Sequence, residues 1–171
     1  MPGDSIISFA YGSNMPTARI RARCPSAVAM GVAKLRGYEL RWHKISNDGS
    51  GKADIVQSDA EGVSVFGVLY RISPDDKAAL DIAEGLGEGY EEVEIVVDYE
   101  GVATSVTAYK ATKTNPNLKP YAWYKALAAF GAKEHNLPEP YVAHIEAVPA
   151  AEDPKRDRHE RNMRLITRGL A

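Results

Sequence analysis

The sequence lacks most features of secreted, membrane-spanning and nucleic-acid-binding proteins. Cys24 is its only cysteine, which excludes a disulfide-stapled extracellular scaffold. A net charge of −2 gives no long-range attraction for phosphate backbones. No segment approaches the roughly 20 apolar residues of a transmembrane helix, and residues 1–9 do not resemble a signal peptide. We therefore expect a cytoplasmic protein with neither a membrane nor a nucleic acid as partner.

Motifs for metals and nucleotides are also missing. The four histidines are scattered, and none stands at a ligand spacing from the cysteine or a carboxylate. Gly85, Gly87 and Gly89 lack the flanking strand and helix order of dinucleotide-binding or phosphate-binding loops. The sequence predicts no metal site.

Length and composition are those of one globular domain. A chain of 171 residues can bury an apolar core around a pocket. We expect the domain to span residues 1–150. Residues 151–171 are dominated by charge, with Met163, Leu165 and Ile166 as the apolar anchors, and we expect a charged tail or late helix packed on the same domain.

Hydrophobic periodicity and turn residues predict a mixture of strands and helices. Apolar patterns predict strands at residues 6–11, 27–35, 38–43, 63–72, 93–98 and 102–110. Capping residues and prolines predict helices starting near Pro16 and at Pro74, and over residues 121–135 and 139–148. Polar stretches at residues 47–51 and 111–120 predict loops, the second long enough to act as a lid or binding edge.

The turn after the first predicted strand is a candidate anion site. Gly12 lacks a Cβ, so successive backbone N–H groups could point into one concave spot. The dipole of a helix beginning near Pro16 would add to the attraction for a carboxylate or phosphate. The alternative is an ordinary turn between a strand and a helix.

Glu84 is a candidate proton acceptor. It stands at the predicted end of a short helix, directly before three glycines. The negative end of the helix dipole disfavours an ionised carboxylate, which would make Glu84 a better acceptor for the proton of an ammonium group. The alternative is a solvated glutamate at a glycine-bearing helix end.

Tyrosines form a third group, comprising Tyr90, Tyr109, Tyr121 and Tyr124. Each has an apolar ring and one hydroxyl able to hold a polar atom of a substrate. Core packing is the alternative, and spacing alone does not separate the two uses.

Five stretches together resemble the γ-glutamylcyclotransferase-like (AIG2-like) family. The segment at residues 9–15, Phe-Ala-Tyr-Gly-Ser-Asn-Met, resembles the family's Tyr-Gly-Ser-Asn opening. The others follow in the family's order: Cys-Pro-Ser-Ala at 24–27, Phe-Gly-Val-Leu-Tyr at 66–70, the Glu-Gly within 80–90, and 124–138 ending in Leu-Pro. The resemblance covers residues 7–148 and leaves the charged tail outside it.

The resemblance implies an α+β fold, in which a compact mixed β-barrel is surrounded by helices and has a pocket at one end. The implied substrate is a small-molecule γ-glutamyl compound. Its α-amine attacks its own γ-amide carbonyl, which closes 5-oxoproline and releases an amino acid or amine. No cofactor is implied, and we expect a monomer or homodimer.

The family's functional residues match named positions here. Glu84 matches the glutamate that accepts the ammonium proton and returns it to the leaving amine. The residues that match the substrate-binding positions are Tyr11, Gly12, Ser13, Asn14, Met15, Tyr90 and Tyr124. Met15 stands where many relatives have leucine, a swap of similar volume.

Two alternatives to this activity remain. One is an enzyme that uses the same cyclisation on a different γ-glutamyl compound, such as an amine, a glutathione-like molecule or a biosynthetic intermediate. The other is a protein of the same fold that binds a small ligand or a partner without turnover.

Overall fold

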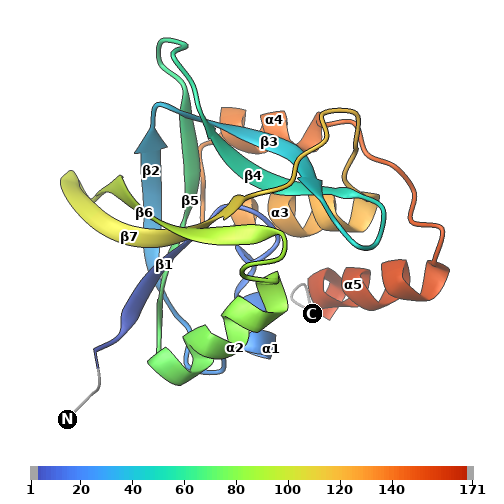
Figure 1. Ribbon diagram of the computed structural model, residues 1–171, viewed down its shortest axis with the longest axis horizontal. Helices are drawn as coiled ribbons and strands as arrows, with labels where there is room; N and C mark the ends of the chain where they lie inside the picture. Colours follow the sequence, from blue (N-terminus) through green and yellow to red (C-terminus); the bar gives the residue numbers. More distant parts are fainter. Residues whose placement is uncertain (1–3, 169–171) are drawn as a thin grey trace.

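The centre of the computed structural model, which describes residues 4–168, is a closed five-stranded barrel (Figure 1). Its strands are β1 (Ile6–Ala10), β2 (Val28–Arg36), β5 (Ser64–Ile72), β6 (Tyr90–Tyr99) and β7 (Val102–Ala111). Their order around the barrel is β1-β5-β2-β6-β7. Parallel pairing of β1 with β7, with Ser8 opposite Thr107, closes the barrel, and the other pairings are antiparallel. The expected α+β fold with a mixed barrel is confirmed.

A separate hairpin of β3 (Tyr38–Ile45) and β4 (Gly51–Gln57) lies beside the barrel. The predicted loop at residues 111–120 runs along β3, where Asn115 N–H donates to the His43 carbonyl at 2.8 Å. No separate bounds were predicted for β4. Residues 53–55 are buried consecutively although Asp54 is polar, so the residue types do not show that both faces of this strand are covered.

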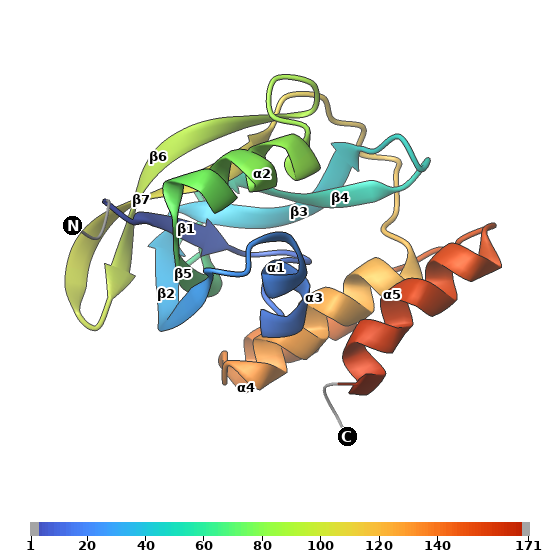
Figure 2. The same ribbon diagram turned by 90° about the horizontal axis from the view of Figure 1, so that it is seen from below.

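In the described part of the chain, five helices surround the strands: α1 (Thr17–Arg23), α2 (Pro74–Glu84), α3 (Ala122–Glu134), α4 (Glu139–Glu146) and α5 (Arg156–Arg168). Figure 2 shows α5 alongside α3, against which it packs. Within residues 4–168, no helix is both long and apolar enough to cross a membrane.

The signals for α2 act as predicted. The Ser73 hydroxyl caps the helix by accepting from Asp76 N–H at 3.2 Å, and Pro74 is the first helical residue. Gly85 ends the helix in the left-handed conformation, with φ of 70°. Glu84 is therefore held at the last position of a capped helix.

The start of α1 differs slightly from the prediction. Pro16 is the N-cap, with an extended backbone, and the helix begins at Thr17. The preceding turn is pressed against α3, because a Cβ built on Gly131 would lie 2.5 Å from the Cβ of Met15. Only glycine at position 131 allows this approach, which fixes the turn between β1 and α1 on the barrel.

Within the charged segment, residues 156–168 form α5. Its Met163, Leu165 and Ile166 are half-buried against the core residues around α3. The preceding segment is tied down by Asp153, which accepts from the Trp123 indole at 2.9 Å. A boundary at residue 150 stays a prediction, and residues 1–3 and 169–171 of the two predicted ranges lie outside the described residues.

Candidate active site

Residues predicted for the site from separate parts of the chain meet at one cavity, here called the inner cavity. Its lining includes most of the residues singled out from the sequence, namely Tyr11, Gly12, Ser13, Asn14, Glu84, Tyr90, Tyr109 and Tyr124. The β1–α1 turn forms one wall and the end of α2 another. The volume of this cavity is about 40 Å³.

Glu84 is bonded to the turn that it faces. Its Oε1 accepts from Asn14 Nδ2 at 2.7 Å and from Arg23 Nη1 at 2.9 Å, and the same guanidinium nitrogen lies 3.2 Å from Asn14 Oδ1. These two hydrogen bonds tie the carboxylate to the β1–α1 turn and to α1. No donor reaches Oε2 from within residues 4–168. One oxygen of Glu84 is thus held in place while the other remains available.

The turn at residues 12–14 has unpaired backbone donors. Met15 N–H donates back to the Gly12 carbonyl at 3.2 Å. In the part of the chain that the structure describes, the N–H groups of Gly12, Ser13 and Asn14 have no protein acceptor. The three residues line the inner cavity, so these N–H groups are candidates to bind a carboxylate there.

Glycine at position 12 is favoured by close packing around the turn. Gly12 is not among the residues with a left-handed backbone. A Cβ at this position would lie 3.0 Å from both Ala53 Cβ and Tyr124 Oη. Close approach to β4 and α3, rather than an unusual backbone angle, therefore favours glycine.

The hydroxyls of the cavity tyrosines are mostly committed to the protein. Tyr11 donates to the Tyr109 carbonyl, Tyr90 to the Ala53 carbonyl at 2.7 Å, and Tyr109 to Asp81 Oδ1 at 2.5 Å. These bonds position the rings but use the protons that the sequence suggested for substrate.

Tyr124 differs from the other three. Its hydroxyl oxygen accepts from Ala53 N–H at 3.0 Å, so its own proton is not used in that bond. Burial raises the pKa of Tyr124 to about 12, which keeps the phenol protonated at neutral pH. Tyr124 is therefore a hydrogen-bond donor at the inner cavity.

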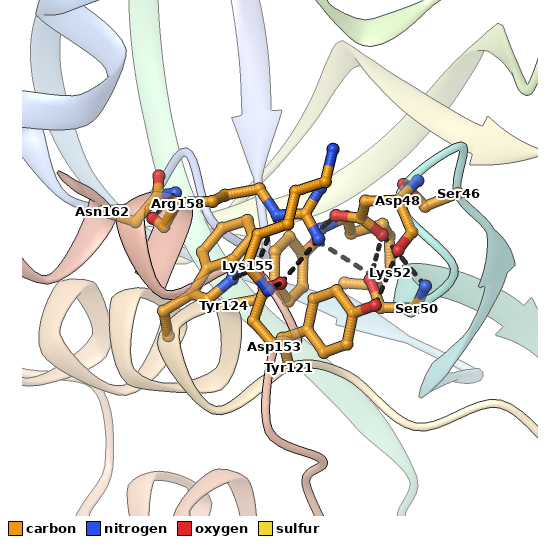
Figure 3. A network of polar contacts seen from close by, with 12 residues as sticks. Ser46, Asp48, Ser50, Lys52, Tyr121, Tyr124, Asp153, Lys155, Arg158 and Asn162 are labelled. Carbon is orange, nitrogen blue, oxygen red and sulfur yellow. Dashed lines mark hydrogen bonds and ion pairs between the residues drawn. The ribbon is translucent and has the colours of Figure 1, made fainter. Parts of the chain in front are cut away.

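Other predicted residues lie away from this cavity. The Met15 side chain is fully buried in the core and does not line the cavity. Its carbonyl accepts from the Tyr70 hydroxyl at 2.6 Å. Tyr121 donates to the Asp48 carbonyl at 2.6 Å within the polar network of Figure 3. From the loop at 111–120, Lys113 lines a separate cavity of about 660 Å³.

Two further cavities adjoin Glu84. A middle cavity of about 130 Å³ is lined by side chains of α1 and of the β3–β4 hairpin, and an outer cavity of about 660 Å³ by residues 44–47 and the segment after α2. Glu84 lines all three cavities. Sequence reasoning missed Arg19 and Arg23 of the middle cavity, although their spacing of four residues on a helix puts both on one face.

The described residues contain no group of three or more His, Cys, Asp or Glu side chains placed to hold a metal ion. One His–carboxylate pair, His43 Nε2 and Asp54 Oδ2, lies 2.7 Å apart, with His43 partly buried and Asp54 buried. Asp54 also accepts from Ala111 N–H at 2.9 Å, which links β4 to the end of β7. This pair fixes the strand that carries Ala53.

Sequence comparisons find relatives over most of the chain. A family profile described as the AIG2-like family matches residues 64–145. A protein of Mus musculus named gamma-glutamylcyclotransferase is 35% identical, with 85% of this chain and 80% of the relative covered. The Homo sapiens protein of the same name is 34% identical, with 85% of this chain and 79% of the relative covered.

Solved structures agree with these matches. A structure named gamma-glutamyl cyclotransferase superposes with a TM-score of 0.86 and 30% identity, covering 97% of this chain and all of the other (100%). A Homo sapiens protein described as uncharacterized superposes with a TM-score of 0.84, also at 30% identity, over 94% of this chain and 98% of its own.

Proposed function

Because the chain belongs to the γ-glutamylcyclotransferase family, we propose that it is an enzyme that cyclises a γ-glutamyl group to 5-oxoproline and releases an amino acid or amine. The observation that carries this proposal is the position of Glu84. One of its oxygens is held by Asn14 and Arg23, and the carboxylate faces a turn with unpaired N–H groups across a small cavity. The lone Cys24 supports a cytoplasmic place of action. A monomer or homodimer stays a prediction.

The reaction needs a base because the attacking amine arrives as an ammonium group. Glu84 Oε2 accepts a proton from this group, and the freed amine nitrogen attacks the γ-carbonyl carbon of the same molecule. The bond between that carbon and the amide nitrogen then breaks. Glu84 gives its proton to the departing nitrogen as this bond breaks. The ring nitrogen, which became cationic in the attack, loses its second proton to the Glu84 carboxylate, and Glu84 passes it to the released amine. The carboxylate is thus regenerated, the lactam is neutral, the amine leaves as an ammonium group, and no other reactant is consumed.

The protein also has to bind the substrate in a folded conformation. The N–H groups of Gly12, Ser13 and Asn14 bind the γ-glutamyl carboxylate, while the Tyr11 and Tyr90 rings form walls of the cavity. Tyr124 donates its free proton to the oxygen that becomes negative during the attack. Holding the amine beside the carbonyl in this way makes the ring closure effectively unimolecular at a fixed geometry.

The size of the inner cavity adds a requirement. About 40 Å³ is space for about one water molecule rather than a γ-glutamyl group. Binding must therefore widen the inner cavity toward the middle cavity, with which it shares Ser13, Glu84, Tyr90 and Tyr124. The amide bond that breaks then lies beside Glu84, where the cavities meet.

Release of 5-oxoproline from γ-glutamyl dipeptides, followed by chromatography, tests the proposal. Glu84→Gln keeps the size of the side chain and an oxygen for Asn14 and Arg23 but removes the base. We expect kcat to fall by roughly 100-fold to 10,000-fold, with an unchanged circular dichroism spectrum. Glu91→Gln, on an exposed position of β6, is the matched control and should keep full activity. Full turnover by the Glu84→Gln variant would refute the assigned base.

A further inference from the structure

The middle cavity is strongly cationic. Its lining includes four basic side chains, Arg19, Arg23, Lys44 and Lys52, and a single carboxylate, Glu84. The basic residues come from α1 and from the β3–β4 hairpin, which are separate in the sequence and meet in the folded protein. Positive charge here exceeds the negative charge that lines the same space.

Two of the four cations are neutralised within the protein. Arg23 pairs with Glu84 at 2.9 Å. Lys52 pairs with Asp48 at 2.9 Å, and its ammonium lies over the rings of Trp123 and Tyr124, 4.3 and 4.5 Å from their centroids. Figure 3 shows Lys52 and Asp48 within the polar network next to α5.

The charge of Arg19 is not neutralised in this way. Its Nη1 donates to the neutral amide oxygen of Asn162 at 2.7 Å, a contact with α5. Its Nε is buried without a hydrogen-bond partner, and no carboxylate lies within 4.0 Å, among residues 4–168. Burial, with the nearby charge of Arg23, lowers the pKa of Arg19 to about 10, so the guanidinium remains protonated at neutral pH.

Lys44 is the second uncompensated cation. Its ammonium lies 4.6 Å from the centroid of the Tyr90 ring and, across the described residues, has no carboxylate within 4.0 Å. Burial lowers the pKa of Lys44. Desolvated cations that lack an anionic partner create a site that an anion stabilises.

We propose that the middle cavity binds a carboxylate of the leaving group, with Arg19 and Lys44 as its ligands and Asn162 as the positioning residue for Arg19. The inference rests on the proposed cyclisation, which leaves the scissile amide beside Glu84. Since Glu84 lines both the inner and the middle cavity, a γ-glutamyl group in the first puts the leaving group in the second. A leaving amino acid or peptide supplies the anion, whereas a simple amine does not.

Paired substrates test this proposal directly. We compare kcat/KM for γ-glutamylalanine and γ-glutamylalaninamide, which differ only in the terminal carboxylate. The wild-type protein should prefer the acid. Arg19→Gln and Lys44→Gln should each lower kcat/KM for the acid by roughly 10-fold to 100-fold, the loss expected for one charge-assisted hydrogen bond, and change the amide by less than about twofold. Arg21→Gln, an exposed residue of the same helix, is the control and should change neither.

Asn162→Asp tests the positioning role with an isosteric change. The new carboxylate would still hold Arg19 but would neutralise its charge, so the preference for the acid should shrink, mainly through KM. A merely structural contact would leave the ratio between acid and amide unchanged. An unaltered ratio in this variant would overturn the role given to Asn162.

Other outcomes separate the inference from the activity on which it rests. Equal losses for acid and amide in the Arg19→Gln variant would overturn the inference, because Arg19 would then contact the γ-glutamyl part or serve the fold. If the wild-type protein releases 5-oxoproline from neither compound, the proposed function fails. In that case, calorimetry measures how tightly the protein binds each of the two unreacted compounds. If the acid binds more tightly than the amide, and Arg19→Gln abolishes this difference, the subsite is supported. Equal binding of the two compounds, or no binding, overturns it.

Discussion

Replacing Gly12 by alanine tests whether the active-site turn depends on close approach to β4 and α3. A Cβ on Gly12 would lie 3.0 Å from Ala53 Cβ and 3.0 Å from Tyr124 Oη. Carbon atoms pack best at about 3.5–4.0 Å, so these neighbours have to retreat by about half an ångström. They do not move independently, because Ala53 N–H donates to Tyr124 Oη.

The magnitude follows from this crowding. Overpacking of this kind costs about 1–3 kcal/mol of unfolding free energy. Gly12 has an ordinary backbone conformation, so no dihedral strain adds to the contact term. We also expect about a tenfold loss of kcat/KM, since displacement of a catalytic donor by about 1 Å can lower a rate about 100-fold.

Urea denaturation and 5-oxoproline release measure the two effects. Gly37→Ala is the control: Gly37 has φ of 76° and open space around it, so alanine there should cost about 1 kcal/mol through backbone strain alone and leave kcat/KM unchanged. Ala53→Gly removes one of the two contacts, so the stability cost of Gly12→Ala should be smaller in that background. An equal cost in both backgrounds, or wild-type stability and activity in the Gly12→Ala variant, would refute the reasoning.

Two further predictions concern stability. Ser73→Ala removes the N-cap of α2 and should cost about 1 kcal/mol in urea denaturation, while kcat/KM for a γ-glutamyl dipeptide changes little. Burial alone would raise the pKa of Asp48, but hydrogen bonds from Lys52 and Ser50 outweigh it and lower the pKa from 3.8 to about 2. The ionised carboxylate therefore stabilises the fold above about pH 4, and this contribution disappears as the pH falls toward 2. The stability gap between wild type and Asp48→Asn should narrow over that interval, and a constant gap in urea titrations would contradict this origin.

Local signals explain which parts of the fold the sequence predicts well. The α2 boundaries follow from Ser73, Pro74 and Gly85, whose effects act within one helical turn. The β6–β7 hairpin follows from residues 100 and 101, whose φ values of 50° and 78° suit the predicted tight turn. Elements marked by their own residues are predictable in this way, whereas β4 depends on neighbours that cover both of its faces.

The candidate site shows the same division. The sequence predicts Glu84 and the Tyr-Gly-Ser-Asn turn as separate candidates, yet the hydrogen bond from Asn14 to Glu84 joins residues 70 positions apart. No local pattern states which polar groups such a contact will pair. Arg19 and Asn162 are 143 positions apart, so the charge balance of the middle cavity becomes visible only in three dimensions. Met15 shows the converse, because it follows the turn residues in the chain while its side chain packs in the core.

The parallel closure between β1 and β7 has a consequence for biosynthesis. The turn that follows β1 is synthesised well before β7, so the strand before this turn lacks one neighbour until residue 107 has emerged from the ribosome. Tyr124 follows later still. One edge of β1 therefore stays unpaired and exposed until its partner strand has been synthesised. Such delayed long-range pairing slows folding and favours aggregation. Catalytic competence on this scaffold is a property that a nascent chain acquires late.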